Sequence, residues 1–205
     1  ESSIGTETPD PVLYVDQASL HSVRVVNEGL EQTTYWLNLR PAIVINEVQH
    51  DEATGWVGGF VELYGEAQQS LTGCVLEGRA HDGATALDLF SIDLIGHALG
   101  PWGYFVLAHD DLVPGTGPGN IDEQLTIVDP PVPYATIGLY LRCNGMVLDA
   151  VCYRGIALPD CGSTAAEDTG DGVAIGRGFH VDTDDSAADF LPQVEPSPWM
   201  RNVTE

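Results

Sequence analysis

The amino-acid sequence predicts an all-β fold, either a sandwich or a barrel. Short runs rich in Val, Ile, Leu, Tyr and Phe recur along the 205 residues, and Gly, Pro, Asn and Asp separate them. The 23 Gly and 13 Pro supply turns, whereas few windows show the apolar spacing of an amphipathic helix. Strands are predicted at residues 22–27, 34–39, 43–49, 58–64, 71–77, 86–92, 103–108, 125–128, 136–143 and 146–154.

The first two predicted strands form a hairpin that turns at Asn27-Glu28-Gly29. The residues before them, ESSIGTETPDP, are typical of a flexible start. Residues 1–41 are therefore predicted to form an N-terminal arm or an extra β-hairpin, and residues 42–205 to form the main domain.

The next two strands each carry an acid in an apolar run, Glu47 and Glu62. Because side chains alternate along a strand, Glu62 shares one face with Phe60 and Tyr64. If the two strands are neighbours, the acids form a carboxylate pair of the kind that glycoside hydrolysis requires. The favoured interpretation is a scaffold role, in which the acids fix a strand through backbone hydrogen bonds or an Arg partner such as Arg177. No catalytic residue is therefore assigned.

Three further strands, at 71–77, 86–92 and 103–108, are short apolar runs between turn residues. Residues 110–123 (DDLVPGTGPGNIDE) are predicted to form a long surface loop. This loop is rich in Gly, but it lacks the Lys and the following helix that a phosphate-binding loop needs.

The clearest hairpin lies in IGLYLRCNGMVLDAVCY and turns at Asn144-Gly145, a pair suited to the positive φ angles of a type I′ turn. The turn predicts that the following residues face each other: Cys143 and Met146, Leu141 and Leu148, Leu139 and Ala150, Ile137 and Cys152. All eight are apolar, so their face is predicted to be the core face. The outer face is predicted to hold Tyr140, Arg142, Val147, Asp149, Val151 and Tyr153, with a weak Arg142–Asp149 pair.

The four cysteines are Cys74, Cys143, Cys152 and Cys161, and none forms a C-x-x-C pair. The even count predicts two disulfides and an oxidising compartment, with four reduced core cysteines as the alternative. Cys143 and Cys152 lie at opposite ends of the hairpin, which excludes their pairing and its complement. Two connectivities remain: 74–143 with 152–161, which is favoured because the loop after Cys152 is short, or 74–152 with 143–161.

The charge of the chain excludes one class of partner. There are 31 acids and seven basic residues, all Arg, and the net charge is −24. Nucleic-acid affinity comes largely from Lys and Arg, so nucleic acid is not an expected partner. No apolar run reaches the roughly 20 residues of a membrane-spanning helix, so no membrane insertion is expected. The acidity favours solubility, and a calcium-rich or salty exterior is the alternative.

The best metal candidate is DTDDSAADF, in which Asp182, Asp184 and Asp189 offer the hard oxygen ligands that calcium prefers. The stretch EDTGDG is a weaker candidate. Neither has the spacing of an EF-hand, and solvated turns and Asx caps are the favoured interpretation of both. No cofactor is assigned with certainty, and calcium is the one candidate.

Three tryptophans, Trp56, Trp102 and Trp199, are candidate anchors for a protein or glycan partner, although burial at an edge of the fold is favoured for them.

Several motifs in fixed order carry a resemblance to a known family. They are Ile45-Asn46-Glu47-Val48, Phe60-Val61-Glu62-Leu63-Tyr64, Leu71-Thr72-Gly73-Cys74-Val75-Leu76, and then LGPWGYFVLAHDD, VLDAVCYRG, GVAIGR, DTDDSAADF and EPSPWMRN. Together they resemble the lamin-tail domain family over residues 43–202. The chain departs from the family pattern in four places, with Gly65 for the usual Asn, Cys74 for the usual Trp, and Trp102 and Trp199 for the usual Gly.

The resemblance implies an immunoglobulin-like β-sandwich that acts as a binding or structural module, without catalysis. Bacterial relatives of this kind are usually secreted or surface proteins, which implies an extracellular or cell-surface location in a bacterium. The function expected is therefore a non-enzymatic module for adhesion, docking or structural attachment. The alternatives are a metal-dependent hydrolase, or an accessory domain of one, and a calcium-stabilised structural spacer.

Overall fold

The computed structural model describes residues 20–26, 32–38, 43–51, 55–81, 86–108, 122–124, 136–155, 158, 161, 164–167, 169, 173–178 and 182–202. The contacts divide the chain into two compact units, 1–42 and 43–205. In the first unit, β1 (Leu20–Val26) pairs antiparallel with β2 (Gln32–Asn38), so the predicted pair of strands is found. The predicted turn at Asn27-Glu28-Gly29 lies outside the described residues.

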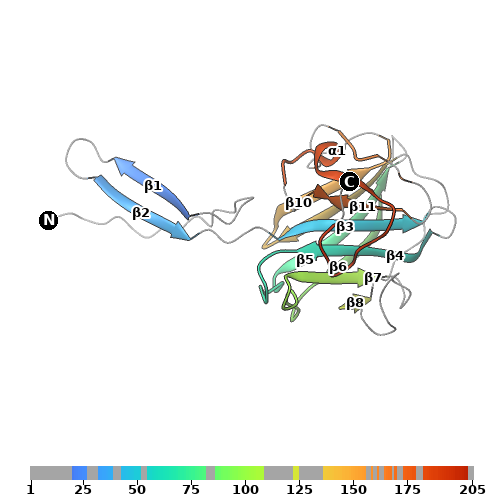
Figure 1. Ribbon diagram of the computed structural model, residues 1–205, viewed down its shortest axis with the longest axis horizontal. Helices are drawn as coiled ribbons and strands as arrows, with labels where there is room; N and C mark the ends of the chain where they lie inside the picture. Colours follow the sequence, from blue (N-terminus) through green and yellow to red (C-terminus); the bar gives the residue numbers. More distant parts are fainter. Residues whose placement is uncertain are drawn as a thin grey trace. The chain divides into compact units, whose positions relative to one another are not determined.

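The second unit is a sandwich of two sheets (Figure 1). One sheet has the strand order β10-β9-β5-β6, and the other has the order β12-β11-β3-β4-β7-β8. The strands are β3 (Val44–Asp51), β4 (Gly55–Tyr64), β5 (Cys74–His81), β6 (Ala86–Asp93), β7 (Tyr104–Ala108), β8 (Glu123–Gln124), β9 (Thr136–Cys143), β10 (Met146–Tyr153), β11 (Ala174–Arg177) and β12 (Phe190–Gln193). Among the strands that the structure describes in this unit, every pairing is antiparallel except that of β7 with the short β8. The predicted all-β sandwich is confirmed.

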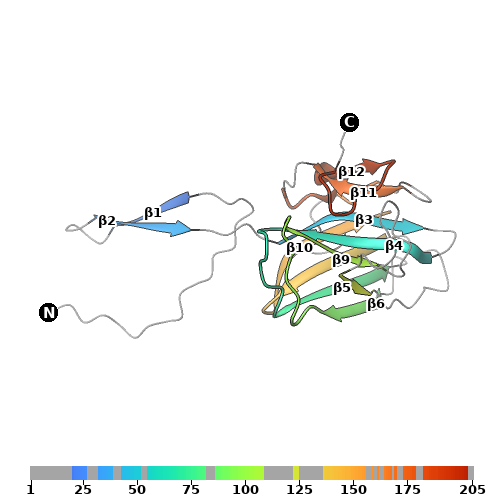
Figure 2. The same ribbon diagram turned by 60° about the horizontal axis from the view of Figure 1, so that its bottom comes forward.

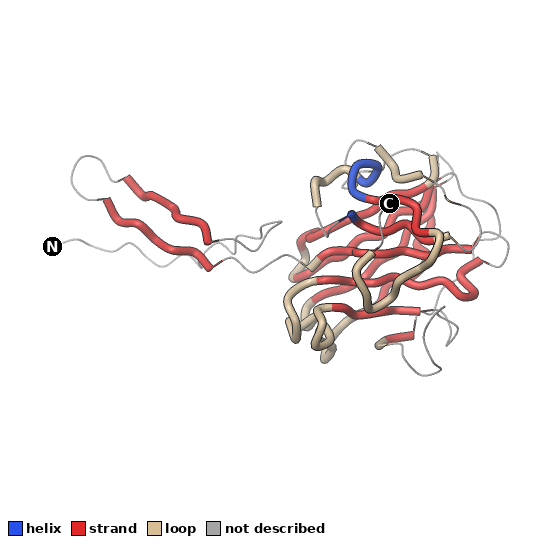
Figure 3. Tube along the Cα trace, in the orientation of Figure 1, coloured by secondary structure: helices blue, strands red, loops and turns tan. Residues whose placement is uncertain are grey.

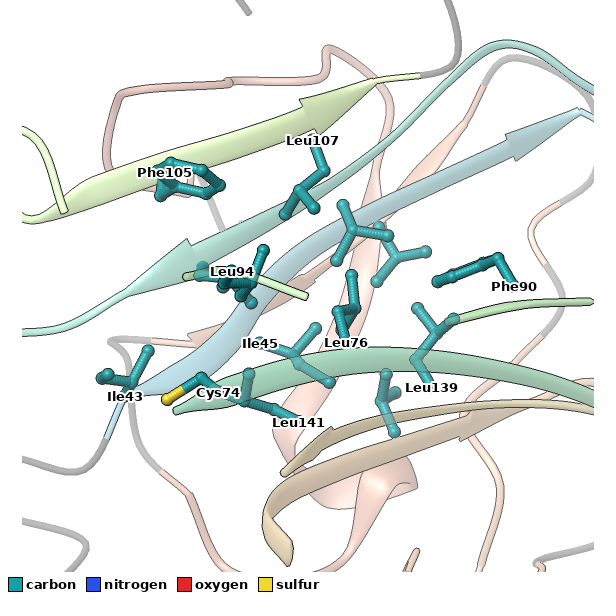
Figure 4. Close-up of a cluster of buried hydrophobic side chains, with 14 of the residues drawn as sticks. Ile43, Ile45, Cys74, Leu76, Phe90, Leu94, Phe105, Leu107, Leu139 and Leu141 are labelled. Carbon is teal, nitrogen blue, oxygen red and sulfur yellow. The ribbon is translucent and has the colours of Figure 1, made fainter. Parts of the chain in front are cut away.

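The core fills the space between the two sheets, which lie one above the other in Figure 2. Alternate side chains of each strand point into this space because successive Cβ atoms lie on opposite faces. Ile45 and Leu107 enter from the six-stranded sheet, and Leu76, Leu139 and Leu141 enter from the four-stranded sheet (Figure 4). All five are 0 % exposed, so the burial of these apolar side chains between the sheets is the main source of stability.

The hairpin of β9 and β10 begins as predicted and then departs from its predicted register. Asn144 and Gly145 have φ angles of 52° and 82°, and Met146 lies opposite Cys143. A β-bulge between Val147 and Asp149 then shifts the pairing, because the extra residue has no partner. After the bulge, every side chain of β10 lies on the face opposite to the predicted one.

The bulge reverses the predicted faces of the five residues that follow it. Asp149, Val151 and Tyr153 are buried on the inner face rather than on the outer one. Ala150 and Cys152, predicted to face the core, instead pack in a separate cluster with Tyr140, Leu158 and Cys161. The predicted Arg142–Asp149 pair is wrong, since Arg142 contacts Glu77 and Asp149 contacts Arg177.

Both disulfides follow the favoured connectivity. Cys74 and Cys143 lie directly opposite each other on β5 and β9 and are bonded, and Cys152 is bonded to Cys161. The separation along the hairpin still excludes a 143–152 bond, although Cys152 does not point inward as predicted. The other connectivity, 74–152 with 143–161, is wrong.

The C-terminal part holds elements that the strand pattern missed. These are β11, β12 and the short helix α1 (Ser186–Asp189), which Asp185 caps by accepting a hydrogen bond from the Ala187 N–H. Strands of four residues separated by polar turns are too short to show a period of two. The strand predicted at 125–128 lies outside the described residues, as does nearly all of the loop predicted at 110–123.

Candidate functional site

Glu47 and Glu62 are paired opposite each other on β3 and β4, as the sequence predicts for neighbouring strands. They lie on the face of the six-stranded sheet that is turned away from the main core, and both are 0 % exposed. A bulge between Ile45 and Glu47 brings Asn46 to the same polar cluster. The sequence signal of this bulge was the pair of consecutive polar residues, Asn46 and Glu47, in an apolar strand. The predicted strand did not take this pair into account.

The two carboxylates hold the C-terminal segment, residues 194–202, against the sheet. The Ser197 N–H donates to Glu47 Oε1 at 2.9 Å, and the Ser197 Oγ lies 3.2 Å from Glu47 Oε2. The Trp199 N–H donates to Glu62 Oε2, and Asn46 Nδ2 donates to Glu62 Oε1 at 2.7 Å. The predicted hydrogen bonds to backbone groups are present, but Arg177, the suggested partner, binds other acids.

Burial sets the ionisation of this pair. It raises the pKa of Glu47 to about 7 and that of Glu62 to about 8, while the hydrogen bonds from Ser197, Asn46 and Trp199 lower both values in part. The neighbouring charges of Glu47 and Asp122 raise the pKa of Glu62 further. A raised pKa suits a general acid, but the 0 % exposure of both side chains keeps a dissolved substrate away from them.

Asn202 completes the attachment of residues 194–202. Its Nδ2 donates to the backbone oxygens of Asn46 at 2.9 Å and of Arg177 at 3.1 Å. This approach needs Gly176, because a Cβ there would lie 2.8 Å from Asn202 Nδ2 and 2.7 Å from the Gln193 side chain. Sequence reasoning missed Ser197 and Asn202, since both come from a segment far from their partners along the chain.

Trp199 takes a backbone conformation that few tryptophans adopt. Its φ angle is 61°, in the left-handed region that favours glycine. The side chain is partly buried against Phe60, Val106 and Ala108, and its Nε1 donates to Asp122 Oδ2 at 3.3 Å. The predicted burial of Trp199 at an edge is thus correct in part. The side chain of Trp56 lies outside the described residues.

A second polar cluster surrounds Arg177, whose side chain is 1 % exposed. Its Nη2 donates to both oxygens of Asp149 at 2.8 Å, and its Nη1 donates to Asp182 at 3.0 Å and to Asp189 at 2.7 Å. The guanidinium also lies 4.6 Å from the centre of the Phe190 ring. Burial raises the pKa of Asp149 to about 6, against the opposing charge of Arg177. One guanidinium is therefore shared by three acidic side chains.

The structure places two of the three predicted calcium ligands, Asp182 and Asp189, around this guanidinium. Asp182 and Asp189 both accept hydrogen bonds from Arg177, and Thr183 donates to Asp189 as well. Asp184 is exposed and uses its backbone N–H to donate to Asp182 Oδ1. Within the described part of the chain, no group of three His, Cys, Asp or Glu side chains is arranged to hold a metal ion. The positive charge that these acids bind in the structure is that of Arg177.

The outer face of the four-stranded sheet carries a smaller set of charges. Arg79 Nη2 and Arg142 Nε both lie 3.1 Å from Glu77 Oε2, and both guanidinium groups lie over the Tyr140 ring. An open pocket of about 310 Å³ lies beside them and is lined by Glu77, Arg79, Asp88, Leu89, Phe90 and Ser91. Because Arg79 and Arg142 are paired with acids, the positive and negative charges around this pocket largely balance.

Trp102 differs from the other tryptophans, because it is 78 % exposed. The burial that was favoured for it is wrong. It lies in the turn between β6 and β7, where Gly100 and Gly103 hold the backbone through a hydrogen bond of 3.0 Å. An indole that protrudes from a fixed turn is available to a partner.

No family model, curated protein or solved structure gives a significant match to this chain. Among the described residues, no helix has the length and apolar character needed to cross a membrane.

Proposed function

We propose that this chain is a non-enzymatic β-sandwich module, secreted or on the cell surface, that serves adhesion, docking or structural attachment. The observation that carries this proposal is that the buried acids are hydrogen-bonded to other parts of the fold. Glu47 and Glu62 hold residues 194–202, while Asp149, Asp182 and Asp189 hold Arg177. Groups with the chemistry for catalysis or metal binding are used to fix the fold, which leaves the turns and sheet faces for binding.

The motif order supports an immunoglobulin-like sandwich of lamin-tail type. The stretches that resemble the family fall on β3, β4, the start of β5, β7, β10, β11 and α1, and the last one forms residues 195–202 over the sheet. Trp199, which replaces the family's usual Gly, has a φ angle of 61°. A position that requires positive φ explains why glycine is usual there.

The two disulfides support an extracellular location. Disulfides form and persist in oxidising compartments, and every cysteine of the chain takes part in one. The resemblance to bacterial surface and secreted proteins favours a bacterial cell surface within that range. The net charge of −24 favours solubility in such a setting and opposes nucleic acid as a partner.

Binding and turnover distinguish the module from a hydrolase. The chain with both disulfides intact is immobilised and exposed to intact bacterial cells, isolated cell-wall polymers and extracellular proteins. Retention of one of these is expected, with no turnover of polysaccharide, peptide, ester or phosphoester substrates. Turnover that disappears in folded Glu47→Gln or Glu62→Gln variants would show that the carboxylate pair is catalytic, and the proposal would then be wrong.

A further inference from the structure

Three turns joined by hydrogen bonds lie at the end of the sandwich where β4 ends and β5 begins (Figure 3). We call residues 65–73, 94–103 and 144–146 the turn platform. The first segment is hydrogen-bonded to both of the others. Its backbone bonds to the second segment include Gly65 N–H to Gly103 O at 3.0 Å and Leu71 N–H to His97 O at 3.0 Å. The Asn144 N–H donates to Gly73 O at 2.8 Å.

Three large apolar side chains protrude from the turn platform. The exposed fractions are 78 % for Trp102, 65 % for Ile95 and 47 % for Met146. Each comes from a turn that contacts a different part of segment 65–73. The turn of Trp102 contacts its beginning, the turn of Ile95 its later part and the turn of Met146 its end at Gly73. The three turns that carry these side chains therefore form a row along segment 65–73.

The backbone beneath this row is held in fixed conformations. Six residues of the turn platform have positive φ angles: Gln68, Gly73, Gly96, Gly103, Asn144 and Gly145. The Cys74–Cys143 disulfide lies directly below and ties two of the segments together. A surface that is ordered before binding loses little conformational entropy when a ligand arrives.

The turn platform is nearly free of charge in a chain whose net charge is −24. Glu66 is the one Asp, Glu, Lys or Arg in its three segments. Depletion of charged residues, together with exposed aromatic residues and Met, is the composition of a binding surface. The negative charge of the rest of the molecule would repel an acidic polymer. A basic partner would bind to the acidic surfaces outside the turn platform. The charge pattern thus favours an uncharged ligand.

Apart from Glu66, the exposed polar side chains of the turn platform are amides and hydroxyls, from Gln68, Ser70, Thr72 and Asn144. Each can both donate and accept a hydrogen bond, as sugar hydroxyls do. The indole of Trp102 offers an apolar ring face of the kind on which the C–H face of a sugar ring stacks. A stable protein interface uses about 20 to 30 residues on each side, and the exposed residues of the turn platform are fewer. Their chemistry and number favour a saccharide over a protein.

We infer that the turn platform binds an uncharged polysaccharide, with Trp102 as the stacking anchor and Ile95 and Met146 as flanking contacts. This inference rests on the proposed docking function and names the ligand class and the surface that serve it.

The test uses the full chain with both disulfides on an array of uncharged oligosaccharides that includes glucans, mannans, xylans, galactans and chito-oligosaccharides. Calorimetry then measures the affinity for the sugar that is retained. Trp102→Ala is expected to weaken binding by about tenfold or more, and Ile95→Ser with Met146→Ser to weaken it less. Val194→Ser and Met200→Ser are matched controls, since they remove exposed apolar side chains (79 % and 63 % exposed) outside the turn platform and should leave the affinity unchanged.

Each other result overturns the inference in a distinguishable way. Sugar binding that Trp102→Ala retains would place the site elsewhere. Binding of a protein or of phosphatidylcholine vesicles instead of sugars, lost in Trp102→Ala, would show that the ligand class is wrong while the docking function stands. Failure to bind any sugar, protein, vesicle or cell would count against the docking function itself. Equal urea midpoints for the wild type and Trp102→Ala verify that the variant is folded.

Discussion

Asp149 and Arg177 connect the two sheets of the sandwich through hydrogen bonds of 2.8 Å from one guanidinium nitrogen to both carboxylate oxygens. Asp149 comes from β10 in one sheet and Arg177 from β11 in the other. Asp149 also accepts the Ile45 N–H at 2.6 Å, and Arg177 Nε donates to Ile45 O at 3.0 Å. The bulge in β10 makes this possible because it turns Asp149 inward, and Ile45 lies beyond Glu47, where the pairing of β3 with β11 ends.

Replacing the buried cation should destabilise the protein strongly. Arg177→Met leaves Asp149, Asp182 and Asp189 without their shared positive charge, and all three side chains are less than a tenth exposed. Loss of one partner from a buried ion pair costs about 3–5 kcal/mol, so the free energy of unfolding should fall by at least this amount. Urea denaturation followed by fluorescence measures the change.

Arg142→Met is the matched control for this variant. Arg142 contacts Glu77 at 3.1 Å, but its side chain is 27 % exposed. Water screens such a pair, so the loss should stay within about 1 kcal/mol. Equal losses for the two variants would show that the Arg177 cluster is not a desolvated ion network.

The stability should fall as the pH rises from about 4.5 to about 8. The pKa values of Glu47 and Glu62 are raised to about 7 and about 8, from the 4.5 of an exposed glutamate. The native state therefore binds more protons than the unfolded chain in this window, and the free energy of unfolding decreases with pH. Each pKa unit corresponds to about 1.4 kcal/mol, so the total change is several kcal/mol. Urea midpoints between pH 5 and 9 measure it.

Glu62→Gln should flatten this pH dependence, because one of the two titrating groups is removed. Glu66→Gln, at an exposed position just after the end of β4, is the control and should leave the slope unchanged. A wild-type protein whose midpoint rises between pH 5 and 8 would show that the carboxylates ionise readily in the fold. The attachment of residues 194–202 would then not bury them as described.

The sandwich could be predicted from the sequence, but its β-bulges could not. Alternation predicted most strands of the two sheets, since a strand with one buried face leaves a period of two in the chain. The Asn144-Gly145 turn was also predictable from its demand for positive φ. The β10 faces were predicted wrongly because a bulge after Val147 is not visible in an apolar strand, yet it turns Asp149 from a surface residue into a core ligand of Arg177.

The candidate sites were predictable only in part, for a related reason. Glu47 and Glu62 stood out as acids in apolar strands, and they do lie opposite each other. Their donors, Ser197 and Trp199, lie about 150 and 137 positions away along the chain, and no local pattern links them. The acids near Asp182 suggested a cation, but the sequence did not distinguish a metal ion from an arginine side chain brought in by β11.

The two disulfides should contribute unequally to stability. Cys74 and Cys143 are 69 residues apart, whereas Cys152 and Cys161 are nine apart. In the chain-entropy model, the longer loop stabilises by about 4 kcal/mol and the shorter one by about 3 kcal/mol. The double variants Cys74→Ala/Cys143→Ala and Cys152→Ala/Cys161→Ala are compared by urea denaturation. A larger loss of unfolding free energy in Cys152→Ala/Cys161→Ala would show that loop-closure entropy does not determine the relative contributions of the two disulfides.

The left-handed backbone at Trp199 should reverse the usual order of glycine and alanine. Both Trp199→Gly and Trp199→Ala lose the ring contacts with Phe60 and Val106, so the difference between them isolates the φ angle of 61°. A residue with a Cβ costs about 1–2 kcal/mol in this region, so the glycine variant should be the more stable by about 1 kcal/mol. At Trp102, which is not among the residues with positive φ, alanine should be equal to or better than glycine. Urea midpoints for the four variants measure both differences. An alanine variant at position 199 as stable as the glycine variant would mean that the segment over Glu62 does not keep this conformation in solution.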